Sequence, residues 1–529
     1  MSGQSRLDGL PDAPPDACVP IPPRFWWLKR IALAAAVLLA GLIGLRVWWG
    51  RVADQRLQAA IDRYRAAGQP VYPEDFDTPH VPDEQNAVKA LRDAEAAIAL
   101  TAEQRSLLDA RISDPAAWRE RAEEVRALLD ANTNALDLLD RARTSPGVDW
   151  DIQVRSPMIG FMPPNLSGQR LVARVSCVAV IYRHYSGDDA GAVALARSAL
   201  SQAKRIGQLP GSIITQLVAM AVSELAISGI EQITPTLQVS GSPEPEGRSA
   251  GSANRSQVRA LIAELLAETP FRDGWCRAIY GERAFQLDVA QGLAGGRMGP
   301  WAIGATGAGT SSLCSRVSGL ILGPMFVLDA VRAARHCTDV AEVGRDAAYP
   351  ATLRREQETS LVSGPSGISG FTRLLSRTMM PPYSRFAQLH FRGIVRRRRA
   401  AAALAIRLFE LDHGTRPERL DELVPGYLPA VPLDPFAEDG RSIAYLPHEE
   451  HPILYSVGPN GLDEGGAFET RGDGWVNPDA KDDPLFLDGA RPGPKVEALA
   501  SAPTSTQAGT DEQNVENNEG KSDQEQHPQ

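Results

Sequence analysis

The pattern of apolar and polar positions singles out one segment near the N-terminus. Residues 31–45 (IALAAAVLLAGLIGL) are apolar without interruption. As a helix they would span about 22 Å, less than the roughly 30 Å hydrocarbon core of a bilayer. Tryptophan pairs at 26–27 and 48–49 extend the segment at both ends, and indole rings favour the membrane interface. We therefore predict one transmembrane helix over residues 26–49, preceded by a disordered, proline-rich stretch over residues 1–25.

A cleaved signal peptide would also contain such an apolar run. The residues that follow it, Trp-Trp-Gly-Arg-Val, form a poor cleavage site because cleavage requires small residues, so a retained anchor is favoured. Basic residues flank the run on both sides, and the positive-inside rule therefore leaves the orientation open. We expect a single-pass protein of a bacterial cell membrane, with the lipid bilayer as a partner and the bulk of the chain on the non-cytoplasmic side.

Helical periodicity continues through the middle of the chain, where apolar residues recur at a spacing near 3.6 between charged ones. This pattern predicts a helical domain over residues 52–234 and a second helical region over 256–398. A stretch rich in Pro, Gly and Ser over 235–255 is predicted to be a flexible linker. Two helices joined by Gly187-Asp188 resemble one tetratricopeptide-type hairpin, without a sustained repeat. Residues 301–328 are apolar but interrupted, which favours a buried helix or loop and not a second membrane span.

No motif in the helical region specifies a reaction. An enzyme of the hydrolase class would need a site assembled from scattered residues such as Glu282, Asp288 and His390, and their spacing does not favour convergence. Carboxylates on helices are usually solvated. The four consecutive arginines at 396–399 are expected to form a solvated face, with contact to anionic lipid or an acidic partner as the alternative.

The pattern changes in the C-terminal part. A helix over residues 399–411 is expected to end at Gly414. Three prolines then exclude a helix and a central strand, and residues 443–446 and 453–457 alternate as two short strands. Glycines suited to tight turns follow, at positions 458, 461, 465 and 466. These features predict a small α+β module over residues 399–488.

This order of elements resembles the C-terminal part of the major pseudopilin of type II secretion. In that family a helix leads into Asp-x-Gly-x-Tyr-Pro, Leu-x-x-Leu, Pro-x-Asp-Pro-aromatic and a Tyr-Ser-x-Gly hairpin. The matching residues here are Asp412, Gly414, Pro417, Leu420, Leu423, Tyr427, Pro429, Pro432, Asp434, Pro435, Phe436, Tyr445, Tyr455, Ser456, Gly458, Gly461, Gly465 and Gly466. The resemblance covers roughly a tenth of the chain and implies a pilin-like fold for the module. Large membrane-anchored bacterial proteins that carry such a module look similar.

The chain departs from that family in two ways. Arg416 stands where the family has tyrosine, and no pilin processing motif precedes the apolar segment. Entry into a filament is therefore not implied. The resemblance does imply calcium binding at the hairpin loop, where Asn460 replaces an acidic residue. Asp463, Glu464 and Asp473 are the candidate ligands, and they supply only part of the oxygen set that Ca²⁺ requires. No other cofactor is expected.

Composition narrows the remaining classes. The chain has 529 residues and a formal net charge of -10. Because binding to phosphates requires clustered Lys and Arg, nucleic acid is not an expected partner. The five cysteines have no CxxC spacing, which argues against a disulfide framework and a zinc site. Residues 490–529 are rich in Pro, Ser, Gln and Glu and are predicted to be a disordered tail.

These patterns favour a mostly α protein with a single N-terminal transmembrane helix, an α-helical body, a small C-terminal α+β pilin-like module and a disordered tail. The favoured function is that of a membrane-anchored, non-catalytic structural or protein-interaction protein of the bacterial envelope, with protein partners that the sequence does not identify. The alternatives are a membrane-tethered hydrolase and a component associated with a type II secretion-like apparatus.

Overall fold

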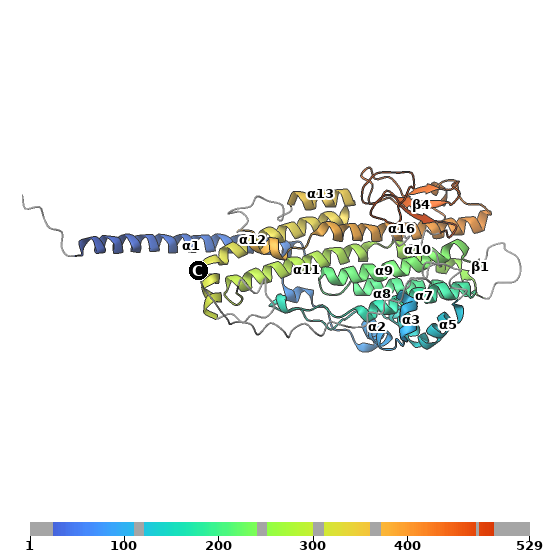
Figure 1. Ribbon diagram of the computed structural model, residues 1–529, viewed down its shortest axis with the longest axis horizontal. Helices are drawn as coiled ribbons and strands as arrows, with labels where there is room; N and C mark the ends of the chain where they lie inside the picture. Colours follow the sequence, from blue (N-terminus) through green and yellow to red (C-terminus); the bar gives the residue numbers. More distant parts are fainter. Residues whose placement is uncertain are drawn as a thin grey trace, which may run out of the picture.

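The computed structural model describes residues 25–109, 121–240, 251–299, 312–359, 372–471 and 476–490. Most of these residues are helical, as the sequence predicts. Figure 1 shows an elongated helical body, with the first helix projecting from one end and the longer strands lying near the other.

The α-helices are α1 Trp26–Ala66, α2 Ala87–Ala96, α3 Ala102–Asp109, α5 Ala122–Ala131, α6 Thr133–Thr144, α7 Ser167–Tyr185, α8 Asp189–Ile206, α9 Ile213–Ile233, α10 Arg255–Leu266, α11 Thr269–Ala294, α12 Ser312–Asp346, α13 Tyr349–Thr359, α15 Leu374–Met379 and α16 Tyr383–His413. The strands are β1 Val239–Ser240, β2 Ala253–Asn254, β3 Ala444–Leu446, β4 Ile453–Ser456 and β5 Asp483–Phe486.

Helix α1 is longer than the predicted membrane helix. It is apolar enough to cross a membrane, and none of its apolar window is buried inside the protein. It then continues without a break to Ala66, with Ala53, Ile61 and Tyr64 buried against the body. The predicted membrane helix and the start of the predicted helical domain therefore lie on one helix, because the amphipathic stretch after the apolar segment contains no helix-breaking residue beyond Gly50.

Among the described residues, two further helices are long and apolar enough to cross a membrane. They cover Ile213–Thr236 and Arg316–Asp346, and 56% of each apolar window is buried inside the protein. The α7–α8 hairpin forms as predicted. Gly187 has a φ of 87°, and Asp188 caps α8 by accepting a hydrogen bond of 2.9 Å from the Gly191 amide.

The predicted linker is partly ordered. β1 pairs with β2 in parallel, with Val239 opposite Ala253, and α10 begins directly after β2 at Arg255. Residues 241–250 of the predicted linker lie outside the described residues.

Helix α16 carries the C-terminal module. The predicted helix start at Arg399 is wrong, since α16 begins at Tyr383. Its end is as predicted, with Gly414 in the left-handed region at a φ of 75°. The two predicted strands form the antiparallel pair β3–β4, and β5 adds a third strand antiparallel to β4. Strand β5 is not predicted from the sequence, because Asp-Pro-Leu-Phe does not alternate between polar and apolar residues.

The apolar cores do not follow the predicted domain boundaries. One buried cluster joins helices α2 to α10 with the second half of α16 and with Leu420, Leu454 and Leu485 of the module. A second cluster joins α11, α12 and the first half of α16 with Phe436 and Val457 of the module. The module therefore shares its core with the body.

Candidate functional site

The joint between α1 and the body is built around one buried arginine. Arg283 on α11 is 0% exposed. Its guanidinium carbon lies 4.0 Å from the ring centroid of Tyr64 on α1 and 4.4 Å from that of Tyr280 on α11. A desolvated cation held against two aromatic faces is a favourable arrangement. The sequence does not reveal this role, because Arg283 stands in an ordinary amphipathic helix.

The N–H groups of Arg283 donate to the segment just after α1 and to α12. Nη1 donates to Gln69 Oε1 at 2.6 Å and to Thr338 Oγ1 at 2.7 Å, and Nη2 donates to the Pro70 carbonyl at 2.7 Å. Burial lowers the pKa of Arg283, yet a guanidinium stays charged in proteins. Among the described residues no carboxylate forms an ion pair with it. Breaking these contacts would leave a buried charge without partners, so the joint holds the end of α1 against α11 and α12.

An open cleft of about 690 Å³ lies beside this joint. Its wall carries cations from Arg65, Arg277 and Arg345 and carboxylates from the loop after α1 and from α11. Two groups that resemble catalytic side chains also line it. Burial raises the pKa of the Cys276 thiol to about 12 and that of the Tyr280 phenol to about 12, so both are neutral near pH 7. A neutral thiol is a poor nucleophile, and the cleft is suited to binding by ion pairs and hydrogen bonds.

The residues considered for a hydrolase site each serve a different local structure. Asp288 accepts a hydrogen bond of 2.7 Å from the Met158 amide. Burial raises the pKa of Glu282 to about 7. His390 is fully buried, stacked 4.9 Å from both the Phe271 and the Trp275 ring. Burial holds the pKa of His390 well below its ordinary value, so the imidazole is neutral.

The four consecutive arginines do not form a solvated face, and that prediction is wrong. Arg396 ion-pairs with Glu231 and Glu224 of α9, and the exposed fraction of its side chain is 15%. Burial alone would lower the pKa of Arg396, but the two carboxylates reverse this and raise it above its ordinary value. Arg397 donates to the carbonyls of α10 residues 264 and 265, and Arg398 ion-pairs with Glu268 at 2.6 Å.

Arg399 completes this arginine cluster by contacting the module. Its side chain is 3% exposed and lies 3.1 Å from an Asp483 carboxylate oxygen on β5 and 3.9 Å from Glu231. The four arginines therefore pair with groups inside the protein, because α16 is surrounded by α9, α10 and the sheet. Glu231 is the central acid of the cluster and has no sequence signature.

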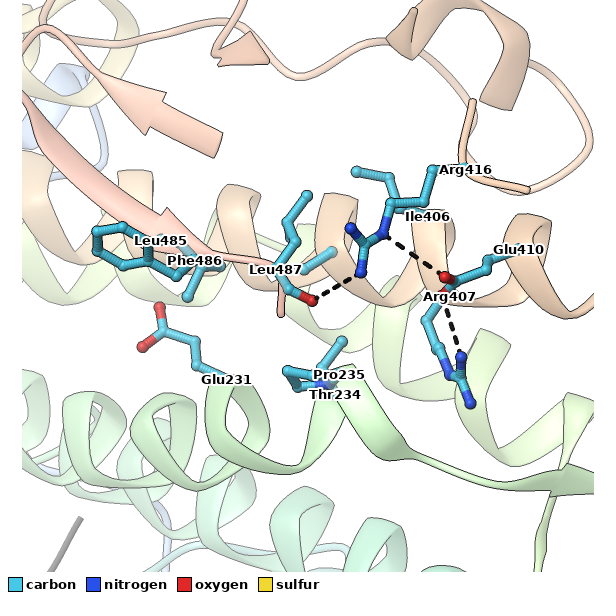
Figure 2. A pocket seen from close by; sticks show the side chains of 11 residues that line it. Glu231, Thr234, Pro235, Ile406, Arg407, Glu410, Arg416, Leu485, Phe486 and Leu487 are labelled. Atoms are coloured by element: carbon cyan, nitrogen blue, oxygen red, sulfur yellow. Dashed lines mark hydrogen bonds and ion pairs between the residues drawn. The ribbon is translucent and has the colours of Figure 1, made fainter. Parts of the chain in front are cut away.

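Figure 2 shows the seam where α9, α16 and β5 meet beyond this cluster. Arg416 donates to the Leu487 carbonyl at 3.4 Å and lies 3.6 Å from Glu410, which also pairs with Arg407 at 3.0 Å. The space between them is about 10 Å³, room for no more than a water molecule. The seam is a packed interface and not a ligand site.

No known protein family, no curated protein and no solved structure matches this chain. Its function therefore has to be inferred from its own geometry.

The predicted calcium loop is placed beside an acid that sequence reasoning missed. Asp463 is engaged by Arg441 at 2.7 Å and by the Tyr455 hydroxyl at 3.0 Å, and Glu464 accepts from Asn460 at 3.0 Å. Asp473 lies outside the described residues. Within the part of the chain that the structure describes, no group of three or more His, Cys, Asp or Glu side chains is arranged to hold a metal ion.

The missed acid is Asp482. It is 0% exposed, and its Oδ2 accepts hydrogen bonds from the Glu464 and Gly466 amides at 3.1 and 2.7 Å. Its Oδ1 and Glu464 Oε2 are buried without a hydrogen-bond partner among the described residues. Burial, together with the nearby Glu464 and Asp463 charges, raises the pKa of Asp482 to about 6. Two unsatisfied carboxylate oxygens are a partial match to a hard-cation site.

Proposed function

We propose that this protein is a non-catalytic tether and interaction protein of a bacterial envelope membrane, and that it holds a pilin-like module at a fixed distance from the bilayer. The observation that carries the proposal is the continuity of α1. One helix runs from an apolar segment with no cover inside the protein to the Arg283 joint. The module is fixed in turn to α16 by the arginine cluster and a shared core.

The pilin-like assignment of residues 399–488 is supported by the order of its elements. A long helix ends at Gly414, a proline-rich segment follows, and a small antiparallel sheet packs on that helix. Asp434 ties the proline-rich segment to β4 by accepting from the Ser456 hydroxyl at 2.9 Å and the Val457 amide at 2.9 Å. The resemblance to the major pseudopilin of type II secretion also favours a body on the non-cytoplasmic side. Digestion of intact spheroplasts with protease tests this, and protection of the body would contradict it.

The cleft beside the Arg283 joint is the proposed docking site for a protein partner. Its neutral thiol and phenol favour binding over nucleophilic chemistry. A photo-crosslinking residue at Thr78 in the cleft is expected to yield one discrete adduct in membranes, whereas the same residue at Ile214, exposed on α9, is not. Equal yields at both positions would contradict this part of the proposal.

Alkaline carbonate extraction tests the anchor. The full chain is expected to stay in the membrane pellet. Replacing Leu38 and Leu39 with arginine places two charges in the apolar window, at a cost of roughly 2.5–3.5 kcal/mol each, and is expected to release the protein. The matched control is Ile214→Arg, which leaves the anchor intact. Release of the unaltered chain would refute the proposal.

A further inference from the structure

Two hydrogen bonds fix how α12 lies beside α1. Arg46 Nε donates to the Leu320 carbonyl near the start of α12, across 274 positions. Gln69 Nε2, just beyond α1, donates to Glu342 Oε1 at 2.8 Å near the end of α12, across 273 positions. The two offsets agree, so the helices run parallel in constant register, and both start from the same end of the body (Figure 1). The first turns of α12 therefore lie at the level of residues 38–46, in the apolar part of α1.

These first turns expose an apolar stripe. Val317, Leu320 and Ile321 are 47%, 68% and 56% exposed, so the expectation of a buried helix or loop over 301–328 is wrong for these described positions. The opposite side of α12 is packed tightly, since a side chain at Gly319 would meet the Leu293 carbonyl of α11 at 2.6 Å. The stripe is therefore exposed by an ordered helix pair, and the register places it level with Ile43 and Val47 of α1, which are also exposed.

Basic side chains surround the same end of the body. Arg51 follows the tryptophan pair of α1, and Arg297 and Arg316 flank the connection between α11 and α12. All three are exposed, and among the described residues none of them forms an ion pair. An apolar stripe with exposed arginines near it is complementary to a leaflet with anionic headgroups.

We propose that the first turns of α12 enter the same leaflet that α1 crosses. Val317, Leu320 and Ile321 then contact acyl chains. Arg316 is level with Leu42 by the same register, and Arg297 follows Gly296, which packs on Arg316, so both arginines extend their long side chains outward to the phosphates. This inference rests on the proposed membrane anchor. It adds a second point of attachment, which fixes the tilt of the body relative to the bilayer where a single helix would leave it free.

The depth of nitroxide labels tests this inference in the full chain, reconstituted in vesicles of phosphatidylcholine and phosphatidylglycerol. Cys18, Cys177 and Cys314 are first replaced by serine, and the two buried cysteines are kept. One label is placed at Val317→Cys and a matched label at Ile43→Cys, which lies at the same level on α1. A label at Ile214→Cys, which is 63% exposed on α9, reports the body away from the stripe. Circular dichroism verifies that each variant is folded.

The measurement compares collisions of each label with oxygen, which partitions into lipid, and with a water-soluble nickel chelate. Labels at 43 and 317 are both expected to favour oxygen, and the label at 214 is expected to favour nickel. A lipid-exposed label at 43 with a water-exposed label at 317 overturns the inference and leaves the anchor standing. A label at 317 shielded from both reagents also overturns it, because a protein then covers the stripe. A water-exposed label at 43 removes the anchor and the inference together.

Discussion

Neutralising Glu231 is expected to destabilise the protein far more than neutralising Glu224, although both pair with Arg396. The side chain of Glu231 is 5% exposed and that of Glu224 is 59% exposed. Glu231 also lies 3.9 Å from Arg399. At an effective dielectric constant of ~20, opposite charges ~4 Å apart attract by about 4 kcal/mol. Glu231→Gln removes this attraction for two buried guanidinium groups at once.

The expected loss for Glu231→Gln is about 3–5 kcal/mol, the range found when one partner of a buried pair is removed. Glu224→Gln is expected to cost about 0.2–1 kcal/mol, because exposed ion pairs contribute little. Urea unfolding of the full chain in a mild detergent, followed by circular dichroism, measures both. Equal losses for the two variants would refute the view that the arginine cluster is a buried clamp. Proteolysis should also cut the module sooner in Glu231→Gln, since Arg399 links Glu231 to β5.

Three further predictions follow from buried polar groups. Arg283→Lys is expected to lower the melting temperature because an ammonium cannot reach the same acceptors while lying between two rings; the exposed Arg297→Lys is the control, and an equal effect of both would contradict the joint. His390→Phe is expected to cost no more than about 1 kcal/mol, since it keeps the stack and removes two buried ring nitrogens that lack partners among the described residues; a larger loss in urea unfolding would show that those nitrogens are bound. The pKa of Asp482 is higher in the folded than in the unfolded protein, so folding is favoured while the carboxyl is protonated. This contribution to stability is fully present below the unfolded-state pKa and is lost as the pH rises through the folded-state pKa of about 6. Asp482→Asn should therefore melt higher than the unaltered protein near pH 8 and similarly near pH 4, with added Ca²⁺ narrowing the difference, whereas a pH-independent difference would contradict the assignment.

Local patterns predicted much of the C-terminal module. Three features followed from residue types that restrict the backbone: the stop at Gly414, the strands β3 and β4, and the positive φ of Gly458, Gly461, Gly465 and Gly466. The Thr-x-x-Gln sequence at Thr101 and Gln104 is a signal of the same local kind, and it forms a capping box with reciprocal hydrogen bonds of 3.0 and 3.2 Å. Each of these signals acts within a few residues, which is why sequence alone suffices.

The predictions that failed for a reason beyond local sequence concern contacts between distant segments. A run of arginines is solvated or buried depending on which acids the fold brings to it, and Glu231 and Asp483 lie far from Arg399 along the chain. The same holds for Arg283, whose acceptors come from the end of α1 and from α12. The exposure of the stripe at Val317 could not be predicted either, because the apolar composition of a helix does not reveal which of its sides packs against α11.

The unbroken course of α1 has a mechanical consequence. About 20 residues of this helix lie beyond Arg46, a length of roughly 30 Å that is comparable to the apolar stretch before it. Because α1 enters the body without a break, any rotation of its apolar half would also rotate the body. One alanine inserted after Gly50 would rotate the two halves of α1 by about 100° and separate them by about 1.5 Å, so α1 could no longer keep both the Arg46–Leu320 and the Gln69–Glu342 hydrogen bonds with α12.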